Sequence, residues 1–153
     1  MTTPVRVRGL YETHLMVSDL DRSLAFYRDV VGLPVALEVP ERAAAFLWIP
    51  DSRRSMLGLW SRGSAPLGMT LHIAFAVDLE DLLEAPARLR ANGVTPLSFF
   101  GDETDEPSVL GWMPAAAVYF NDPDQHLLEY LAMLDTEPRP DVGIVGWSEW
   151  SSI

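Results

Sequence analysis

The segment of residues 115–134 has the pattern of two β-strands joined by a tight turn. An apolar, β-favouring run over residues 117–120 is followed by Asn-Asp-Pro-Asp, whose side chains cap the backbone and whose proline presets φ. The strand after the turn alternates, and this places Glu129 on the same face as aliphatic side chains. A carboxylate there costs several kcal/mol unless a cation, a hydrogen-bond donor or a metal compensates it. The sequence therefore predicts a compensating partner for Glu129.

An internal repeat organises the rest of the chain. The first half predicts a strand over residues 9–17 that carries His14, a helix from Ser18 or Asp19 to Gly32, and short strands over 35–39, 43–49 and 55–60. The pattern restarts at residue 69 with a strand that carries His72 at the corresponding point. A helix over about 78–93, a strand over 94–100 and the hairpin complete it. Each half is thus expected to be a β-α-β-β-β module, which makes the fold class α+β.

The domain prediction follows from this repeat. We expect one domain over residues 1–134, with module one at 9–60, a Gly/Ser/Pro-rich linker at 61–68 and module two at 69–134. Residues 135–153 have no counterpart in the repeat and are expected to form a C-terminal arm. Because the arm carries Trp147 and Trp150, it should pack on its own domain or on a partner subunit. The acidic stretch 101–114 is expected to be a loop, and a candidate lid.

Composition excludes several classes of function. The chain has 153 residues, a net charge of −11, no cysteine and no lysine, since all eleven basic residues are arginine. Thiolate nucleophiles, disulfides and lysine Schiff bases are therefore excluded. An acidic chain without a basic face argues against nucleic acid as a partner. No apolar run suits a signal peptide or a membrane span, so we expect no membrane partner and a cytoplasmic protein.

Three residues at related positions predict a metal site. His14 and His72 lie on the first strand of their repeats, and Glu129 lies on the last strand of the second. A single histidine in a strand is more often a hydrogen-bonded core residue, but the repeat-related placement favours metal binding. Two imidazoles and one carboxylate can form a facial triad that leaves coordination positions open for substrate or oxygen. His126 is an odd number of residues from Glu129, so it points to the opposite face and receives no ligand role.

Two motifs resemble those of a known family. The sequence THLMVSDLDRSLAFYRDVVGLPV is similar to the opening module of the vicinal oxygen chelate superfamily, and YFNDPDQHLLEYL is similar to its closing strand pair. That pair is usually written Asp-Pro-x-Gly-x-x-x-Glu, and Gln125 stands here at the glycine. The resemblance covers residues 9–134. It implies paired modules that form a cupped, barrel-like mixed sheet around a divalent metal, with His14, His72 and Glu129 at ligand positions.

The branches of this superfamily differ in their further residues. Glyoxalase I adds an acid on the last strand of the first module, and residues 56–60, MLGLW, have none. Extradiol dioxygenases place a catalytic tyrosine ten residues before the glutamate, where Tyr119 stands, but their additional histidine has no match. Fosfomycin enzymes use a lysine, which is absent here. Bleomycin-resistance proteins bind without metal, and the full triad argues against that branch.

The expected function combines these points. We expect an enzyme that uses one divalent ion (Fe, Ni, Mn or Zn) and acts on a small molecule that chelates the metal through vicinal oxygens. It is a lactoylglutathione-lyase-like lyase or isomerase, or a dioxygenase, with Glu129 and Tyr119 as catalytic residues. The alternative is a non-catalytic binding protein of the bleomycin-resistance type. A homodimer is expected, as in the family. Aromatic candidates for the substrate pocket are Phe46, Trp48, Trp60, Phe99, Phe100 and Trp112.

Overall fold

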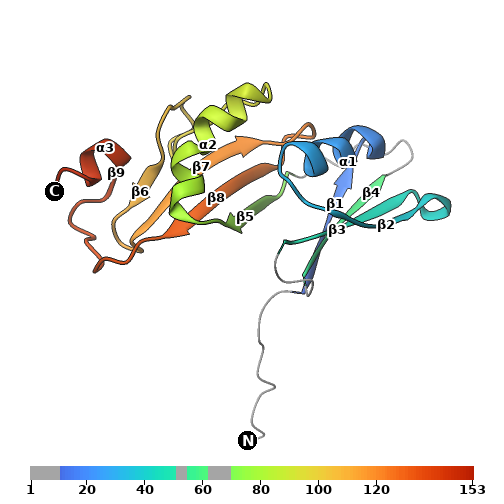
Figure 1. Ribbon diagram of the computed structural model, residues 1–153, viewed down its shortest axis with the longest axis horizontal. Coiled ribbons are helices and arrows are strands. Elements are labelled where there is room, and N and C mark those ends of the chain that lie inside the picture. Colours follow the sequence, from blue (N-terminus) through green and yellow to red (C-terminus); the bar gives the residue numbers. More distant parts are fainter. Residues whose placement is uncertain (1–10, 51–54, 62–69) are drawn as a thin grey trace, which may run out of the picture. The chain divides into compact units, whose positions relative to one another are not determined.

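The computed structural model describes residues 11–50, 55–61 and 70–153. The chain divides into two compact units, Met1–Gly68 and Met69–Ile153, and each is described by itself. Figure 1 shows the elements of both units. Residues 9–10 of the first expected strand, and residues 62–68 of the expected linker, lie outside the described residues. Within the described part, no helix is long and apolar enough to cross a membrane.

The first unit is a four-stranded mixed sheet with strand order β1-β4-β3-β2, and β1 and β4 are parallel. Helix α1 packs on β3 and β4 and buries Leu24 and Tyr27. Asp19, one of the two caps that the sequence predicts, accepts a hydrogen bond from the Arg22 amide. The elements are β1 (Glu12–Val17), α1 (Leu20–Asp29), β2 (Val35–Val39), η1 (Pro40–Arg42), β3 (Ala44–Trp48) and β4 (Met56–Ser61).

The second unit is a five-stranded mixed sheet with strand order β5-β8-β7-β6-β9, in which β5 and β8 are parallel. Helix α2 packs on β7 and β8, and Leu82 and Leu89 point into the core. The elements are β5 (His72–Ala76), α2 (Leu79–Ala91), β6 (Ser108–Leu110), β7 (Ala115–Asn121), β8 (Leu127–Met133), β9 (Ile144–Gly146) and α3 (Trp147–Trp150). The two β-α-β-β-β modules and the α+β class predicted from sequence are confirmed.

One strand prediction is wrong. Residues 94–100 form no strand, and only Leu97 makes isolated bridges, to Tyr119 and Glu103. Pro96 has no amide hydrogen to donate to a ladder, and the chain turns back directly after Leu97, with Gly101 at φ 87°. The second strand of this module is instead β6, which lies inside the stretch that the sequence predicts as a loop.

The C-terminal segment joins the second unit. Strand β9 pairs antiparallel with β6 and so becomes the edge strand of the sheet. Next to it, the Gly111 amide donates to the Gly143 carbonyl over 2.8 Å, and the Arg139 amide donates to the Gly111 carbonyl over 2.7 Å. The Glu106 carboxylate accepts hydrogen bonds from the Ser148 amide and hydroxyl at the start of α3. These contacts attach the segment to the residues that precede β7.

The turn between β7 and β8 contains one strained residue. The Asp122 carboxylate accepts hydrogen bonds from the amides of Asp124 and His126, and Gln125 adopts a left-handed conformation with φ 69°. A residue with a Cβ atom is disfavoured there by about 1–2 kcal/mol. This conformation explains why glycine is usual at this point of the motif.

Gln125→Gly is therefore expected to stabilise the protein by roughly 0.5–1 kcal/mol. Relief of left-handed strain outweighs the entropy that glycine adds to the unfolded chain. Urea unfolding followed by circular dichroism measures the difference. Gln125→Ala is the matched control, because it removes the exposed side chain but keeps the Cβ atom, and it should give no gain. Equal stability of the two variants would show that backbone strain is not the cause.

A second prediction concerns Tyr130, which packs on Phe120 and Phe75. Burial raises the pKa of its phenol to about 12. Above pH ~10 the phenol of the unfolded chain ionises while the folded one stays protonated, so the free energy of unfolding falls as pH rises from 10 to 12. We expect Tyr130→Phe to lessen this fall by roughly 2 kcal/mol. Denaturant unfolding at pH 9, 10, 11 and 12 measures it, and parallel curves for the two proteins would contradict it.

Candidate functional site

His72 and Glu129 meet on one face of the second unit. They lie on the neighbouring parallel strands β5 and β8, where Ala74 is the register partner of Glu129. His72 Nε2 lies 3.0 Å from Glu129 Oε2. The glutamate side chain is only 7% exposed, whereas the imidazole is 48% exposed. The partner that the sequence predicts for the Glu129 charge is thus a histidine that remains open to a ligand.

The second ring nitrogen of His72 determines what this pair can bind. Nδ1 lies 3.1 Å from the Leu127 carbonyl oxygen, which can only accept, so Nδ1 carries the hydrogen. In a neutral ring, Nε2 then directs a lone pair toward the Glu129 carboxylate. Two electron-rich groups at this distance need a cation between them, either a proton or a metal ion. A ring nitrogen that donates to a backbone carbonyl is the usual arrangement of a metal-binding histidine.

The spacing of the pair also fits a metal ion. Ligand bonds of about 2.0–2.2 Å place neighbouring nitrogen and oxygen ligands about 3 Å apart, close to the separation of Nε2 and Oε2. Within the described residues, no group of three or more His, Cys, Asp or Glu side chains is placed to hold a metal. His72 and Glu129 are two neighbouring side chains of the types that bind divalent metals.

Tyr119 adjoins this pair. It is the register partner of Glu129 across β7 and β8, and its ring stacks on His72 with a centroid distance of 6.3 Å. Burial, the negative charge of Glu129 and a hydrogen bond to it all raise the pKa of Tyr119. The phenol is therefore protonated at neutral pH and is a donor beside the carboxylate.

A cavity of about 300 Å³ opens at these residues. Phe99, from the segment that lacks strand pairing, forms one wall and packs edge-on against Tyr119. The volume and the aromatic wall suit a small, partly apolar molecule. The lining residues are His72, Leu97, Ser98, Phe99, Gly101, Tyr119, Leu127 and Glu129.

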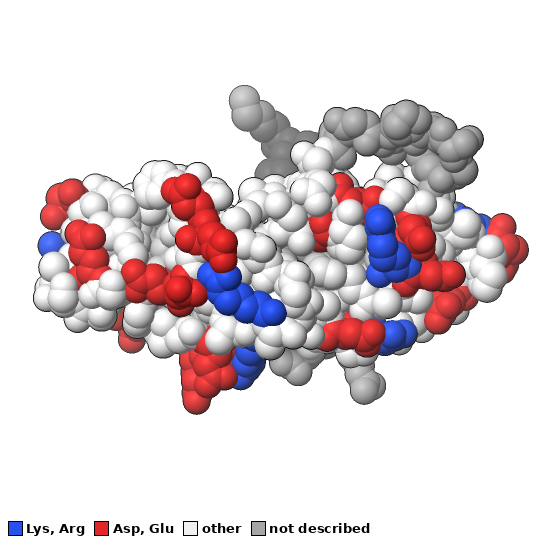
Figure 2. Space-filling model, turned by 90° about the horizontal axis from the view of Figure 1, so that it is seen from above, with Lys and Arg blue, Asp and Glu red and all other residues white. Residues whose placement is uncertain are grey.

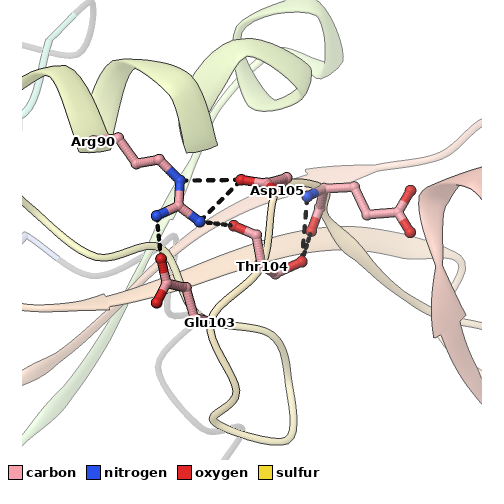
Figure 3. Close-up of polar contacts among 5 residues, drawn as sticks. Arg90, Glu103, Thr104 and Asp105 are labelled. Carbon is pink, nitrogen blue, oxygen red and sulfur yellow. Dashed lines mark hydrogen bonds and ion pairs between the residues drawn. The ribbon is translucent and has the colours of Figure 1, made fainter.

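Arg90 attaches the loop that follows this wall to helix α2 (Figure 3). Its guanidinium binds the carboxylates of Asp105 and Glu103 and donates to the Thr104 carbonyl over 3.1 Å. The acidic stretch is thereby fixed to the helix along residues 103–105. Trp112, expected to belong to a lid or a substrate pocket, is 59% exposed and does not line the cavity.

His14 belongs to the first unit, where aromatic rings surround it. Its centroid lies 5.9 Å from that of Phe46 and 5.7 Å from that of Trp60. The imidazole lies over Gly58, where a Cβ atom would come within 2.7 Å of its Cδ2. His14 Nε2 lies 3.4 Å from Glu12 Oε1, and both side chains are partly exposed. The absence of a side chain at position 58 thus leaves room for the histidine.

Two more of the predicted aromatic residues, and the third histidine, can be placed in the structure. Trp48 lies on β3, two residues beyond Phe46, and Phe100 is 70% exposed and packs edge-on against Phe99. His126 is buried, and its Nδ1 accepts a hydrogen bond from the Leu71 amide, so it fastens the start of β8 to the residue before β5. Glu12 is not among the residues that the sequence predicts for the site, although strict alternation along β1 places it on the face of His14.

Charged side chains of both signs are mixed on the surface of the described residues. On the face shown in Figure 2, arginines lie beside acidic side chains and form no continuous basic patch among the described residues. Arg88, for example, binds Asp81 and Glu84 on the same helix. Such paired arginines are not available to neutralise a phosphate backbone.

Comparison with known proteins identifies the family. Residues 9–130 match the model of the Glyoxalase/Bleomycin resistance protein/Dioxygenase superfamily. Lactoylglutathione lyase of Salmonella typhimurium is 30% identical over 135 residues, which cover 82% of this chain and 93% of that protein. Lactoylglutathione lyase of Escherichia coli O157:H7 is 28% identical over the same shares of the two chains.

Solved structures show the same fold. An integron cassette protein from the mobile metagenome of the Halifax Harbour sewage outfall superposes with a TM-score of 0.71 and 28% identity, over 83% of this chain and all of that one. Lactoylglutathione lyase from Agrobacterium tumefaciens gives a TM-score of 0.63 and 26% identity, over 82% and 94% of the two chains. The fosfomycin resistance protein FosX from Listeria monocytogenes gives 0.62 and 25%, over 82% and 91%.

The fold of paired modules, with a histidine–glutamate pair beside a small cavity, is that of a glyoxalase-like protein. The chain belongs to the Glyoxalase/Bleomycin resistance protein/Dioxygenase superfamily. The resemblance found in the sequence is confirmed. Members of this superfamily include lyases, dioxygenases and fosfomycin-resistance enzymes.

Proposed function

We propose that this protein is a divalent-metal-dependent enzyme, a lyase or isomerase of the lactoylglutathione-lyase type, that acts on a small molecule with two neighbouring oxygens. The observation that carries the proposal is the His72–Glu129 pair, in which Nδ1 donates to a backbone carbonyl and Nε2 faces the carboxylate. His14 is the proposed third ligand, from its place in the repeat. A bound divalent ion would act as a Lewis acid toward the substrate oxygens.

The residues of the second unit have separable roles in this proposal. Glu129 is held in place by burial and by its partner His72, so it presents one oriented carboxylate to the cavity. Tyr119 keeps its proton at neutral pH and is available to donate a hydrogen bond to an oxygen that gains negative charge. Phe99 and Leu97 exclude water from the apolar side of the cavity.

A dioxygenase is the second reaction compatible with the same ligands, because a triad leaves positions open for oxygen. The second candidate function is a binding protein without turnover. The observation that favours it is the composition of β4, which carries Met56, Gly58 and Trp60 and no acid on the face of His14. Ligand binding that survives chelator treatment would support this candidate.

The direct test is a metal analysis of protein purified without a metal-chelating tag. We expect about one equivalent of divalent ion per chain, and loss of that ion on dialysis against a chelator. Elemental analysis of the purified and dialysed protein measures both. Protein without stoichiometric metal that also fails to bind Fe²⁺, Ni²⁺, Mn²⁺ or Zn²⁺ on titration would refute the enzyme proposal.

We also propose a homodimer, because members of this family often pair modules between subunits. Light scattering of the purified chain measures the mass in solution. A monomer at all concentrations would contradict this part of the proposal and leave the metal site untouched.

A further inference from the structure

His14 has a carboxylate partner on its own strand. Glu12 and His14 are two residues apart on β1, so their side chains emerge on the same face of the sheet. Glu12 Oε1 lies 3.4 Å from His14 Nε2. Of the two side chains, the histidine is 39% exposed and the glutamate 44% exposed, so the pair is accessible to a ligand.

The last strand of the first unit supplies no such partner. In the second unit, Glu129 is the register partner of Ala74, the residue two positions after His72. In the first unit, the residue two positions after His14 is Met16, and its register partner is Trp60. An indole therefore occupies the position that corresponds to Glu129. The indole Nε1–H is a donor only, so it offers a metal no ligand. This atom is buried and has no hydrogen-bond partner among the described residues.

The neighbours of His14 hold its ring beside Glu12. Gly58 leaves the space into which the imidazole lies, and a Cβ atom there would displace it. Phe46 and Trp60 pack against the ring, and these two rings contact each other edge-on at 6.0 Å. The ring is thus packed by aromatic side chains, and its Nε2 atom lies near the Glu12 carboxylate.

We propose that Glu12 is a metal-binding carboxylate, which pairs with His14 in the same way that Glu129 pairs with His72. Each unit then has one histidine–glutamate pair of its own, with Nε2–Oε separations of 3.4 Å and 3.0 Å. The carboxylate absent from β4 is replaced by one on β1, so the absence of an acid on β4 does not imply loss of a carboxylate ligand. This inference rests on the proposed metal-dependent function.

The test compares Zn²⁺ affinity among variants of the full chain, by competition with a chromophoric chelator. We expect Glu12→Gln to weaken Zn²⁺ binding by about 10-fold or more. Glu41→Gln is the matched control, since it removes the same charge from another exposed carboxylate of the first unit and should stay within about 2-fold of the wild type. Equal affinities of Glu12→Gln and wild type would overturn the inference.

A rescue variant separates ligation from charge. Glu12→His places a neutral ligand at the same position and should bind Zn²⁺ several-fold more tightly than Glu12→Gln. A rescue variant as weak as Glu12→Gln would mean that Glu12 acts only through its charge, and this also overturns the inference. Failure of the proposed function looks different, because wild-type protein would then bind no Zn²⁺ at all. Circular dichroism of each variant verifies that it is folded.

Discussion

Glu129→Gln is expected to weaken divalent-metal binding by about 100-fold or more, the largest functional effect that the structure predicts. Glutamine has the shape of glutamate but no negative charge, and its amide is a poor ligand beside His72 Nε2. The buried carboxylate is oriented by the strand pair and by Tyr119, so no exposed acid can take its place. Because the partner imidazole is half exposed, water can solvate it, and the fold should survive the change.

Isothermal titration with Zn²⁺ or Mn²⁺ measures this effect. The control is Glu137→Gln, which removes an exposed carboxylate of the same unit that lies outside β8 and does not line the cavity, and it should leave the affinity unchanged. His72→Ala should weaken binding similarly, since it removes the other member of the pair. Metal affinity that persists in Glu129→Gln would place the metal elsewhere and remove the basis of the proposed function.

Gly111→Ala is expected to destabilise the protein by about 2–3 kcal/mol, the largest effect on stability. A Cβ atom at this position would lie 2.4 Å from the Arg139 carbonyl oxygen and 3.0 Å from the Gly143 carbonyl oxygen. Both obstacles are backbone atoms, and Gly111 also hydrogen-bonds to both residues. The C-terminal segment would therefore have to move away, and its pairing through β9 would weaken.

Thermal and urea unfolding give the change in free energy. Gly146→Ala is the contrasting variant, because the added Cβ atom would meet only the carboxylate end of Glu106, a flexible side chain. It should cost clearly less than Gly111→Ala. Equal effects of the two variants would show that the close approach of backbone at Gly111 does not determine how the segment is attached.

The patterns that depend on neighbouring residues were predictable. Alternation along β8 placed Glu129 among aliphatic side chains on one face, and the Ser-Asp helix start limited the cap to Ser18 or Asp19. The turn chemistry of the closing hairpin was also clear. Only the structure shows that Gln125, which stands where the motif usually has glycine, adopts a positive φ. These features follow from local geometry, in which side-chain period and capping leave few choices.

The wrong and missed predictions concern contacts between distant parts of the chain. Residues 94–100 have strand composition, but Leu97 has only two bridge partners, and β6 is the strand that pairs with β7. The pairing of β9 with β6 joins segments more than 30 residues apart, and no local sequence pattern predicts it. Strand pairing depends on which edges are free in the assembled sheet, and that is a property of the whole unit.

By itself the sequence determined the duplicated module, the buried acid at Glu129 and the two histidines at equivalent points. Only the tertiary structure decided that His72 directs Nε2 at Glu129, that Tyr119 adjoins them, and that Glu12 is the carboxylate beside His14. The physical reason is that period and propensity act between near neighbours. A binding site instead depends on cross-strand register and ring packing, which are set only when the sheet has formed.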